Sequence, residues 1–417
     1  MLFLRLEVVS LRGMESSRAE RPLRAKERLV LMDGVRGLAL FGIFLVNLRV
    51  MGAPSMAYGA HSVWSGTVAQ GSELLSAFLF DGAFWTLFAL LFGAGFSVMM
   101  GRAGPRERSI GLAAYYRRLF LIGVFGLLHV LFLWWGDILM VYAIAGMALP
   151  LFRRCRVRVL LIWAALFILI PLGFYLLLLA AGQLAGPETM AEWAAEYDSE
   201  TRAWVSYLVE SYRSSDFVTV AWARLEEFGY NLWYALCFLP SALGVMLIGM
   251  TLAKAERFRL HPGQNTFYRK LLFWSVVPAV AGKLAYTSGF LAGETFNLPA
   301  NTAFLFGAAI GGLAAGLVYL CAVRAFYLSG AACWLRDGLA AAGRMALTLY
   351  LMQSLIAGLL FYGYGLGLYA SVPPYALWPL GLAIFAGQMA FARYWLARHR
   401  MGPLEYLLRR FTYFSKG

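Results

Sequence analysis

The chain has 417 residues, of which 61% are hydrophobic, 16% aromatic and only 14% charged, whereas an ordinary soluble domain is about half apolar and about a quarter charged. This composition excludes a soluble globular protein and calls for a bilayer, which a helix crosses with about 20 mostly apolar residues. The net charge of +14 lies between the apolar runs rather than in one patch, so we expect the lipid bilayer, and no nucleic acid, as a partner.

The first 28 residues form a basic segment with seven Arg or Lys residues. Its short apolar start lacks a small-residue cleavage site, so we do not predict a signal peptide. Met14 opens a second natural start, MESSRAERPLRAKERL, in which case residues 1–13 are a misassigned extension.

Ten apolar runs follow, and they predict an all-α integral membrane protein, a polytopic bundle of about ten transmembrane helices. The runs lie near residues 34–50, 74–100, 116–135, 138–152, 158–182, 230–253, 271–290, 302–326, 344–364 and 375–396. With a cytoplasmic N-terminus, the segments on that face carry 31 of the 36 Lys and Arg residues. Because cytoplasmic loops are enriched in Lys and Arg, we predict that both termini are cytoplasmic.

One sizeable segment, residues 183–229, is predicted to lie on the outer face. It is rich in acidic and aromatic residues, and Glu188, Glu192 and Glu196 repeat at helical spacing. We expect one or two amphipathic helices over the outer mouth, which act as a lid or form only a solvated surface.

The C-terminal stretch GPLEYLLRRFTY is typical of a basic amphipathic segment on the cytoplasmic membrane surface. The predicted parts of the chain are the N-terminal segment 1–28, membrane helices one to five over 29–182, the acidic segment 183–229, membrane helices six to ten over 230–396, and the tail 397–417.

Few ionisable residues fall inside the apolar runs, and each is a functional candidate because a charge in the bilayer costs about 3 kcal/mol on insertion scales. His129 lies eleven residues after Arg118, which at 1.5 Å per residue is about 16 Å into the bilayer. Histidine titrates near neutrality, so we interpret His129 as a general base. The alternative is a histidine that is hydrogen-bonded to a neighbouring helix.

Three further charged residues lie in or beside the runs. Asp137 begins the fourth run, where we expect it to cap free backbone N–H groups. A second role, orienting His129, requires the hairpin to fold back. Eight residues along one helix would separate the two side chains by about 12 Å. Asp81 precedes a glycine in the second run. A cap on a broken helix and a functional role are equally good interpretations of this residue. Lys283 is expected to snorkel to the membrane surface and is given no role.

Arg36 stands at the inner end of the first run. Together with Arg117, Arg118 and Arg344 at other cytoplasmic helix ends, it is predicted to form a pocket for phosphates. The alternatives are a local ion pair between Arg36 and Asp33 and, for the other arginines, the ordinary cytoplasmic enrichment of basic residues.

Uncharged polar residues also interrupt the runs. Thr348, Gln353 and Ser354 in the ninth run more often make interhelical hydrogen bonds than contact a ligand. Asn47 and Gln353 are nevertheless candidates to donate a hydrogen bond to an oxyanion.

Small and sulfur-containing residues predict packing rather than chemistry. Gly93 and Gly95 in FALLFGAGF allow close helix approach. The four cysteines form no CxxC pair and have no neighbouring histidine, so neither a disulfide framework nor a metal site is predicted.

Five stretches in chain order carry a family resemblance. They are DGVRGLALFGIFLVN (33–47), FWTLFALLFGAGF (84–96), RRLFLIGVFGLLHVLFLWWGDILMVYAIAG (117–146), AAGRMALTLYLMQS (341–354) and GPLEYLLRR (402–410). Together they resemble the YeiB-like bacterial inner-membrane proteins, whose C-terminal half is domain of unknown function 418. The resemblance implies a polytopic inner-membrane protein without an established activity.

The opening stretch, an acidic residue followed by an RG pair and a span ending in Asn47, is also similar to the transmembrane acyltransferase superfamily. That superfamily includes the heparan glucosaminide acetyltransferase and bacterial polysaccharide O-acetyltransferases. The similarity implies acyl groups drawn from cytoplasmic acyl-coenzyme A and an intramembrane histidine. His129 stands in a GLLH context that departs from the superfamily's histidine motif.

Acyl transfer from cytoplasmic acyl-coenzyme A is therefore the leading hypothesis. The donor's phosphates dock near Arg36 and Arg118, and His129 deprotonates an acceptor that enters from outside. The acceptor is an envelope glycan, a lipid head group or a small molecule such as an amine. Asp137 assists His129, and Asn47, Asp81 and Gln353 contact the substrate.

Two alternatives stay open. The first is a transporter or exporter of a small solute, coupled to protons through His129 and Asp81, although paired midplane charges and related halves are not evident. The second is a non-catalytic membrane protein. The sequence does not predict the oligomeric state.

Overall fold

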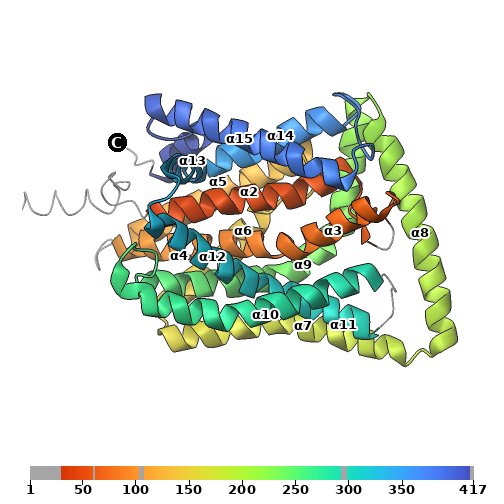
Figure 1. Ribbon diagram of the computed structural model, residues 1–417, viewed down its shortest axis with the longest axis horizontal. Helices are drawn as coiled ribbons and strands as arrows, with labels where there is room; N and C mark the ends of the chain where they lie inside the picture. The colour runs from red at the N-terminus through yellow and green to blue at the C-terminus, as the bar shows by residue number, and fades with distance from the viewer. Residues whose placement is uncertain (1–29, 60–61, 103–107, 293–297, 414–417) are drawn as a thin grey trace, which may run out of the picture.

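The protein is a bundle of helices, most of which run side by side along one direction (Figure 1). The computed structural model describes residues 30–413 except 60–61, 103–107 and 293–297. The predicted N-terminal segment 1–28 lies outside the described residues.

The helices follow one another with short connections. In chain order they are α2 (Val30–Gly52), α3 (Thr67–Leu79), α4 (Ala83–Arg102), α5 (Arg108–Phe132), α6 (Leu139–Gly146), η3 (Leu149–Phe152), α7 (Val157–Gln183), α8 (Pro187–Arg213), α9 (Phe217–Lys254), η4 (Pro262–Gln264), α10 (Asn265–Ala292), α11 (Leu298–Phe306), η5 (Gly307–Gly311), α12 (Gly312–Ser329), α13 (Cys333–Arg344), α14 (Ala346–Phe361), α15 (Pro374–Arg398) and α16 (Pro403–Thr412).

The prediction of an all-α membrane bundle is confirmed. In the described part of the chain, eight helices are long and apolar enough to cross a membrane, and the pair α13 and α14, bent by 87°, brings the number to nine. The fourth predicted run, residues 138–152, forms only the 8-residue α6 and the short η3. At 1.5 Å per residue α6 is about 12 Å long, which is too short to cross a bilayer. The two short helices together return the chain toward the end of the bundle at which α5 begins, where the Tyr115 hydroxyl donates to the Gly146 carbonyl at 2.8 Å.

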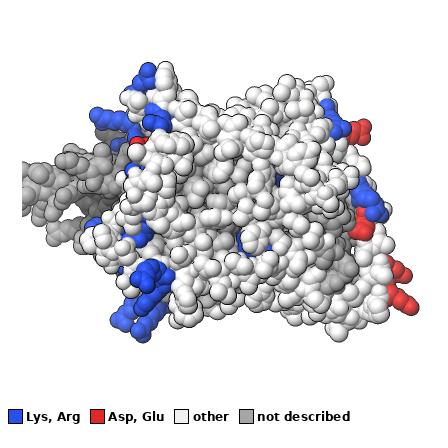
Figure 2. All heavy atoms as spheres, in the orientation of Figure 1, with Lys and Arg blue, Asp and Glu red and all other residues white. Residues whose placement is uncertain are grey.

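Charge is divided between the two ends of the bundle. Figure 2 shows Lys and Arg side chains gathered at the end where the C-terminus lies, Asp and Glu side chains mainly at the opposite end, and almost no charge between them on this face. We call the first the basic end, which holds Arg36, Arg118 and Arg344, and the second the acidic end, which holds α8.

The acidic segment forms one long helix. α8 has 27 residues and crosses the helix ends at the acidic end (Figure 1). Its last turn is tied to the connection between α14 and α15, because the Gly363 N–H donates to the Tyr212 carbonyl at 2.8 Å and Arg213 Nε donates to the Tyr369 carbonyl at 2.9 Å. Residues from Phe217 onward, which we predicted to belong to this outer segment, begin α9.

The core lies where α2, α4, α9 and α12 pack together. α4 and α9 approach closely because Gly93 faces the backbone of Met246 and Gly249 faces the backbone of Leu90, and a Cβ at either glycine would overlap those carbonyls. The predicted packing role therefore holds for Gly93. Gly95 has open space beside it and lines a cavity instead.

Candidate functional site

His129 lies on the last turn of α5, and the chain turns back directly after it. Asp137, in the connection to α6, brings its Oδ2 to 2.9 Å from His129 Nδ1, while its Oδ1 accepts the Met140 N–H at 2.7 Å. One carboxylate thus makes both contacts that the sequence analysis considered, the helix cap and the contact that orients the histidine.

Gly126 allows this fold-back. It lies three residues before His129, on the adjacent turn of α5, and a Cβ there would stand 2.5 Å from Asp137 Oδ1 and 2.7 Å from the backbone N of Met140. Only a glycine leaves room for α6 to begin so close to α5. The GLLH stretch therefore contains both the histidine and the space for the residue that orients it.

The other ring nitrogen of His129 contacts a residue far away in the chain. His129 Nε2 lies 2.7 Å from Ser354 Oγ on α14. The side chains of His129 and Asp137 are 0% and 1% exposed, and Ser354 is also buried. We call Asp137, His129 and Ser354 the triad. Sequence reasoning did not link Ser354 to His129, because nothing in the chain marks a pairing between residues 225 positions apart.

Aromatic rings surround the triad. The ring centroid of Tyr350 lies 5.0 Å from that of His129, and Trp134 packs edge-on at 6.1 Å. The Tyr350 hydroxyl and the Trp134 indole N–H are buried without a hydrogen-bond partner in the described structure. Buried polar groups are normally paired, so these two donors are available to a ligand.

A cavity of about 470 Å³ extends from the basic end toward the triad, and its size is within the range of small-molecule pockets. Its wall combines apolar side chains of α2, α4, α5, α6, α14 and α16. It reaches Tyr350, which contacts His129, and Ile138, the residue after Asp137. We call it the inner cavity. Neither His129 nor Ser354 lines it in this structure, so Tyr350 and Ile138 form the boundary between the cavity and the triad.

Five arginines line the inner cavity at the basic end, and they outnumber the acidic side chains that line it. The arginines are Arg36, Arg118, Arg344, Arg400 and Arg409, and the acidic residues are Asp33 and Glu405.

Both carboxylates of the inner cavity are already engaged. Asp33 pairs with Arg36 at 3.1 Å, so the ion pair that we considered as an alternative is present. Glu405 of α16 accepts the backbone N–H groups of Leu347 and Thr348 and thereby caps α14 just after its sharp bend from α13. Arg118 has neither a hydrogen-bond partner nor an ion-pair partner among the described residues. The rim therefore retains positive charge for an anion.

Three sequence-predicted site residues lie elsewhere. Arg117 donates from Nε to the Thr412 carbonyl at 3.0 Å, and this bond holds α16 against α5. Gln353 is buried and donates to Gln388 at 2.9 Å. Asn47 is half-buried on α2. None of the three lines the inner cavity.

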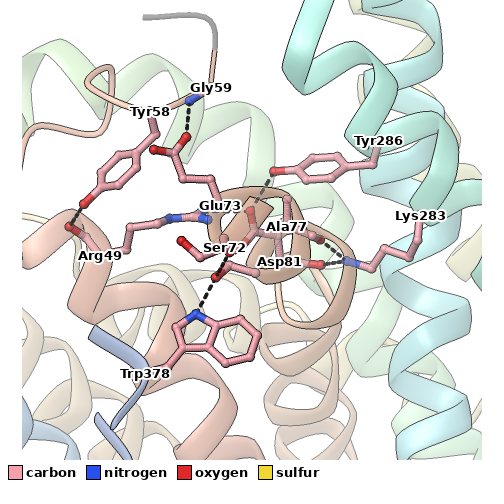
Figure 3. A network of polar contacts seen from close by, with 11 residues as sticks. Arg49, Tyr58, Gly59, Ser72, Glu73, Ala77, Asp81, Lys283, Tyr286 and Trp378 are labelled. Carbon is pink, nitrogen blue, oxygen red and sulfur yellow. Dashed lines mark hydrogen bonds and ion pairs between the residues drawn. The ribbon is translucent and has the colours of Figure 1, made fainter. Parts of the chain in front are cut away.

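Asp81 belongs to a separate buried network (Figure 3). Its Oδ2 pairs with Arg49 at 2.8 Å and accepts the Tyr286 hydroxyl at 3.2 Å. Lys283 Nζ donates to the backbone carbonyls of Ala77 and Asp81, at the break between α3 and α4. The expectation that Lys283 snorkels outward is wrong, because its side chain points into the bundle and only 3% of the residue is exposed. We call Arg49, Asp81, Lys283 and Tyr286 the charge network, and none of its members lines the inner cavity.

Metal ligands and thiols are not gathered at either site. Within the described residues no group of three or more His, Cys, Asp or Glu side chains is placed to hold a metal ion. All four cysteines are free thiols.

Comparison with known proteins finds relatives over nearly the whole chain. The chain is 30% identical over 414 residues to the uncharacterized protein YxaH of Bacillus subtilis strain 168, covering 95% of this chain and 96% of that protein. It is also 30% identical to the uncharacterized protein YeiB of Escherichia coli strain K12, covering 94% of this chain and 98% of the relative. The family model described as "Protein of unknown function (DUF418)" matches residues 252–415. No solved structure matches the chain.

Proposed function

The chain belongs to the YeiB-like DUF418 family of membrane proteins, and from this premise we propose that it is a membrane-embedded acyltransferase. It takes an acyl group from acyl-coenzyme A and transfers it to a glycan or small-molecule acceptor of the cell envelope.

One observation carries the proposal: a single cavity has an arginine rim at one end and ends, at the other, at Tyr350, whose ring contacts the buried His129. Acyl-coenzyme A has the same order of chemical groups, since a flexible arm separates its phosphates from its thioester. Arginines suit phosphates because their planar guanidinium groups form paired hydrogen bonds with them. The apolar wall of the inner cavity suits the acyl chain.

The triad supplies the chemistry of transfer. Asp137 orients the His129 ring, and His129 Nε2 accepts the proton of the attacking hydroxyl or amine. The unpaired Tyr350 hydroxyl is the donor best placed to stabilise the oxyanion that forms on the thioester carbonyl. In this role Tyr350 replaces Asn47 and Gln353, which lie away from the inner cavity.

The division of charge supports one orientation of the protein in the membrane. Lys and Arg are enriched on the cytoplasmic side of membrane proteins, so the basic end faces the cytoplasm, where acyl-coenzyme A is made. In the proposed orientation both termini are inside and α8 lies on the outer face of a bacterial inner membrane, with the acceptor entering from the side of α8.

The charge network favours a second candidate, proton-coupled transport of a small solute. Ionisable residues buried in a bundle often mark an ion or proton path, and Arg49, Asp81 and Lys283 form such a group. We rank transport second because the charge network does not line the inner cavity and Lys283 closes the break between α3 and α4.

Donor turnover distinguishes the two functions. Purified protein in nanodiscs is given acetyl-coenzyme A or longer acyl donors with envelope extract, and free thiol is measured for the wild type and His129→Ala. The proposal predicts release that is lost in the variant. Uptake or efflux by proteoliposomes without a donor, combined with no thiol release, would support transport and refute acyl transfer.

A further inference from the structure

Ser354 makes a hydrogen bond that differs from those of several other helical hydroxyls in this protein. Thr86, Thr251 and Thr412 each donate to the backbone carbonyl four residues earlier, at 2.8, 3.1 and 2.6 Å. This is the usual way in which a hydroxyl within a helix is satisfied. Ser354 instead contacts His129 Nε2 at 2.7 Å.

The direction of this bond follows from the other side of the imidazole. The Asp137 carboxylate accepts hydrogen bonds, so His129 Nδ1 carries the hydrogen of the 2.9 Å contact between them. In the neutral ring Nε2 is then an acceptor, and the Ser354 hydroxyl donates to it. A serine held in this way has its proton directed at a base, as in an activated nucleophile.

We propose that Ser354 is the nucleophile of the triad and carries the acyl group as a serine ester between donor and acceptor. This inference rests on the proposed acyltransferase function and adds a covalent intermediate to it.

Tyr350 connects Ser354 with the inner cavity. The two residues are four positions apart on α14, so they lie on one face of the helix, a turn apart. Tyr350 lines the inner cavity, and its hydroxyl is buried without a described partner. A thioester carbonyl that passes Tyr350 therefore meets a hydrogen-bond donor that lies one helical turn from Ser354.

The reaction has two balanced steps. In the first, Ser354 Oγ attacks the thioester carbonyl carbon while His129 takes the serine proton; the carbon–sulfur bond breaks, and the coenzyme thiolate leaves with that proton. In the second, the acceptor hydroxyl or amine attacks the serine ester while His129 takes its proton. Ser354 Oγ then leaves, recovers the proton, and the triad is restored.

A covalent carrier suits a site reached from two sides. In the proposed function the donor approaches from the basic end and the acceptor from the acidic end, while the triad side chains are almost completely buried. With the acyl group held on Ser354, the donor and the acceptor do not occupy this closed site together, and neither coenzyme A nor the acceptor has to cross the membrane.

The first step requires no acceptor, so it is testable with a donor alone. Protein in nanodiscs is mixed with acetyl-coenzyme A, free thiol is followed over the first turnover, and the denatured protein is digested for mass spectrometry. The wild type is expected to release about one thiol per protein in a burst and to carry one acetyl group on the peptide with Ser354. Ser354→Ala is expected to lose both signals, and Ser354→Cys to form a hydroxylamine-sensitive thioester.

Ser275→Ala is the matched control, since Ser275 is a buried serine of α10 outside the triad, and it keeps both signals. Full turnover with envelope extract by Ser354→Ala, or an acetyl group on His129 instead, would overturn the role of Ser354 and leave acyl transfer intact. If the wild type neither bound the donor nor released thiol, both proposals would be overturned.

Discussion

The Asp137 carboxylate contacts His129 across the turn between α5 and α6, and the same carboxylate caps α6. The orientation of the histidine is therefore coupled to the start of α6. Four predictions follow from this contact and from the surroundings of the two buried sites.

Asp137→Asn separates the two roles of the carboxylate. The amide oxygen still accepts the Met140 N–H, but an amide N–H facing His129 Nδ1 favours the tautomer in which Nε2 carries the hydrogen. His129 then no longer takes a proton from Ser354. We expect turnover to fall by about 10³–10⁴-fold with little change in melting temperature, measured by thiol release and thermal unfolding. Wild-type turnover in this variant would exclude the assigned tautomer.

Gly126→Ala tests the space that admits Asp137. The added methyl overlaps Asp137 Oδ1 and the Met140 backbone, and a displacement of about 1 Å at a reacting group lowers turnover by about 10²-fold. Gly123→Ala, one turn earlier on α5, is the control, because a Cβ there meets only Ala143 at an ordinary 3.7 Å. Equal turnover of the two variants would show that the close approach of α6 is unimportant for the reaction.

Arg118→Ala tests the rim of the inner cavity. A hydrogen bond to a charged group contributes about 1.5–3 kcal/mol, so loss of this arginine is expected to weaken coenzyme A binding about 10- to 100-fold. Binding is measured by calorimetry in nanodiscs at two salt concentrations. Arg154→Ala, an exposed arginine that does not line the inner cavity, is expected to bind as the wild type does. An unchanged affinity in Arg118→Ala would place the phosphates elsewhere.

The charge network is expected to be structural. Asp81→Leu leaves Arg49 buried without its partner, which destabilises a protein by about 3–5 kcal/mol, whereas replacing both partners with apolar residues restores most of the loss. Thermal unfolding of Asp81→Leu and of the double variant with Arg49→Met measures this. The exposed pair of Arg259 and Glu256, with side chains 64% and 62% exposed, is the control, and its removal changes stability by about 0–1 kcal/mol. Normal stability combined with lost solute uptake in Asp81→Leu would favour transport.

The sequence predicts most of the spans because a membrane helix is a local property of about 20 consecutive residues. α2, α7 and α15 cover the predicted runs with only a few residues of difference at their ends. The run at 138–152 is the exception, since it forms two short helices, α6 and η3, in place of one continuous helix.

The site was predictable only where its residues are close in sequence. His129 and Asp137 are eight positions apart, and the one open question was whether the hairpin folds back. Ser354 and Arg49 were missed because their partners, His129 and Asp81, lie 225 and 32 positions away. Such pairs depend on how the helices pack, and a single sequence contains no direct signal for that. Lys283 was misassigned for the same reason, since snorkelling was inferred from its long stem alone.

The central claim is that one cavity brings an acyl donor from the arginine rim to His129. A titration of acetyl-coenzyme A with the wild type, Arg118→Ala and His129→Ala, with free thiol as the readout, tests both ends of the cavity in one assay. We predict that Arg118→Ala raises KM with little change in kcat, and that His129→Ala abolishes kcat while donor binding persists. If the wild type released thiol and neither substitution altered kcat or KM, the inner cavity would not be the donor site and the account would be wrong.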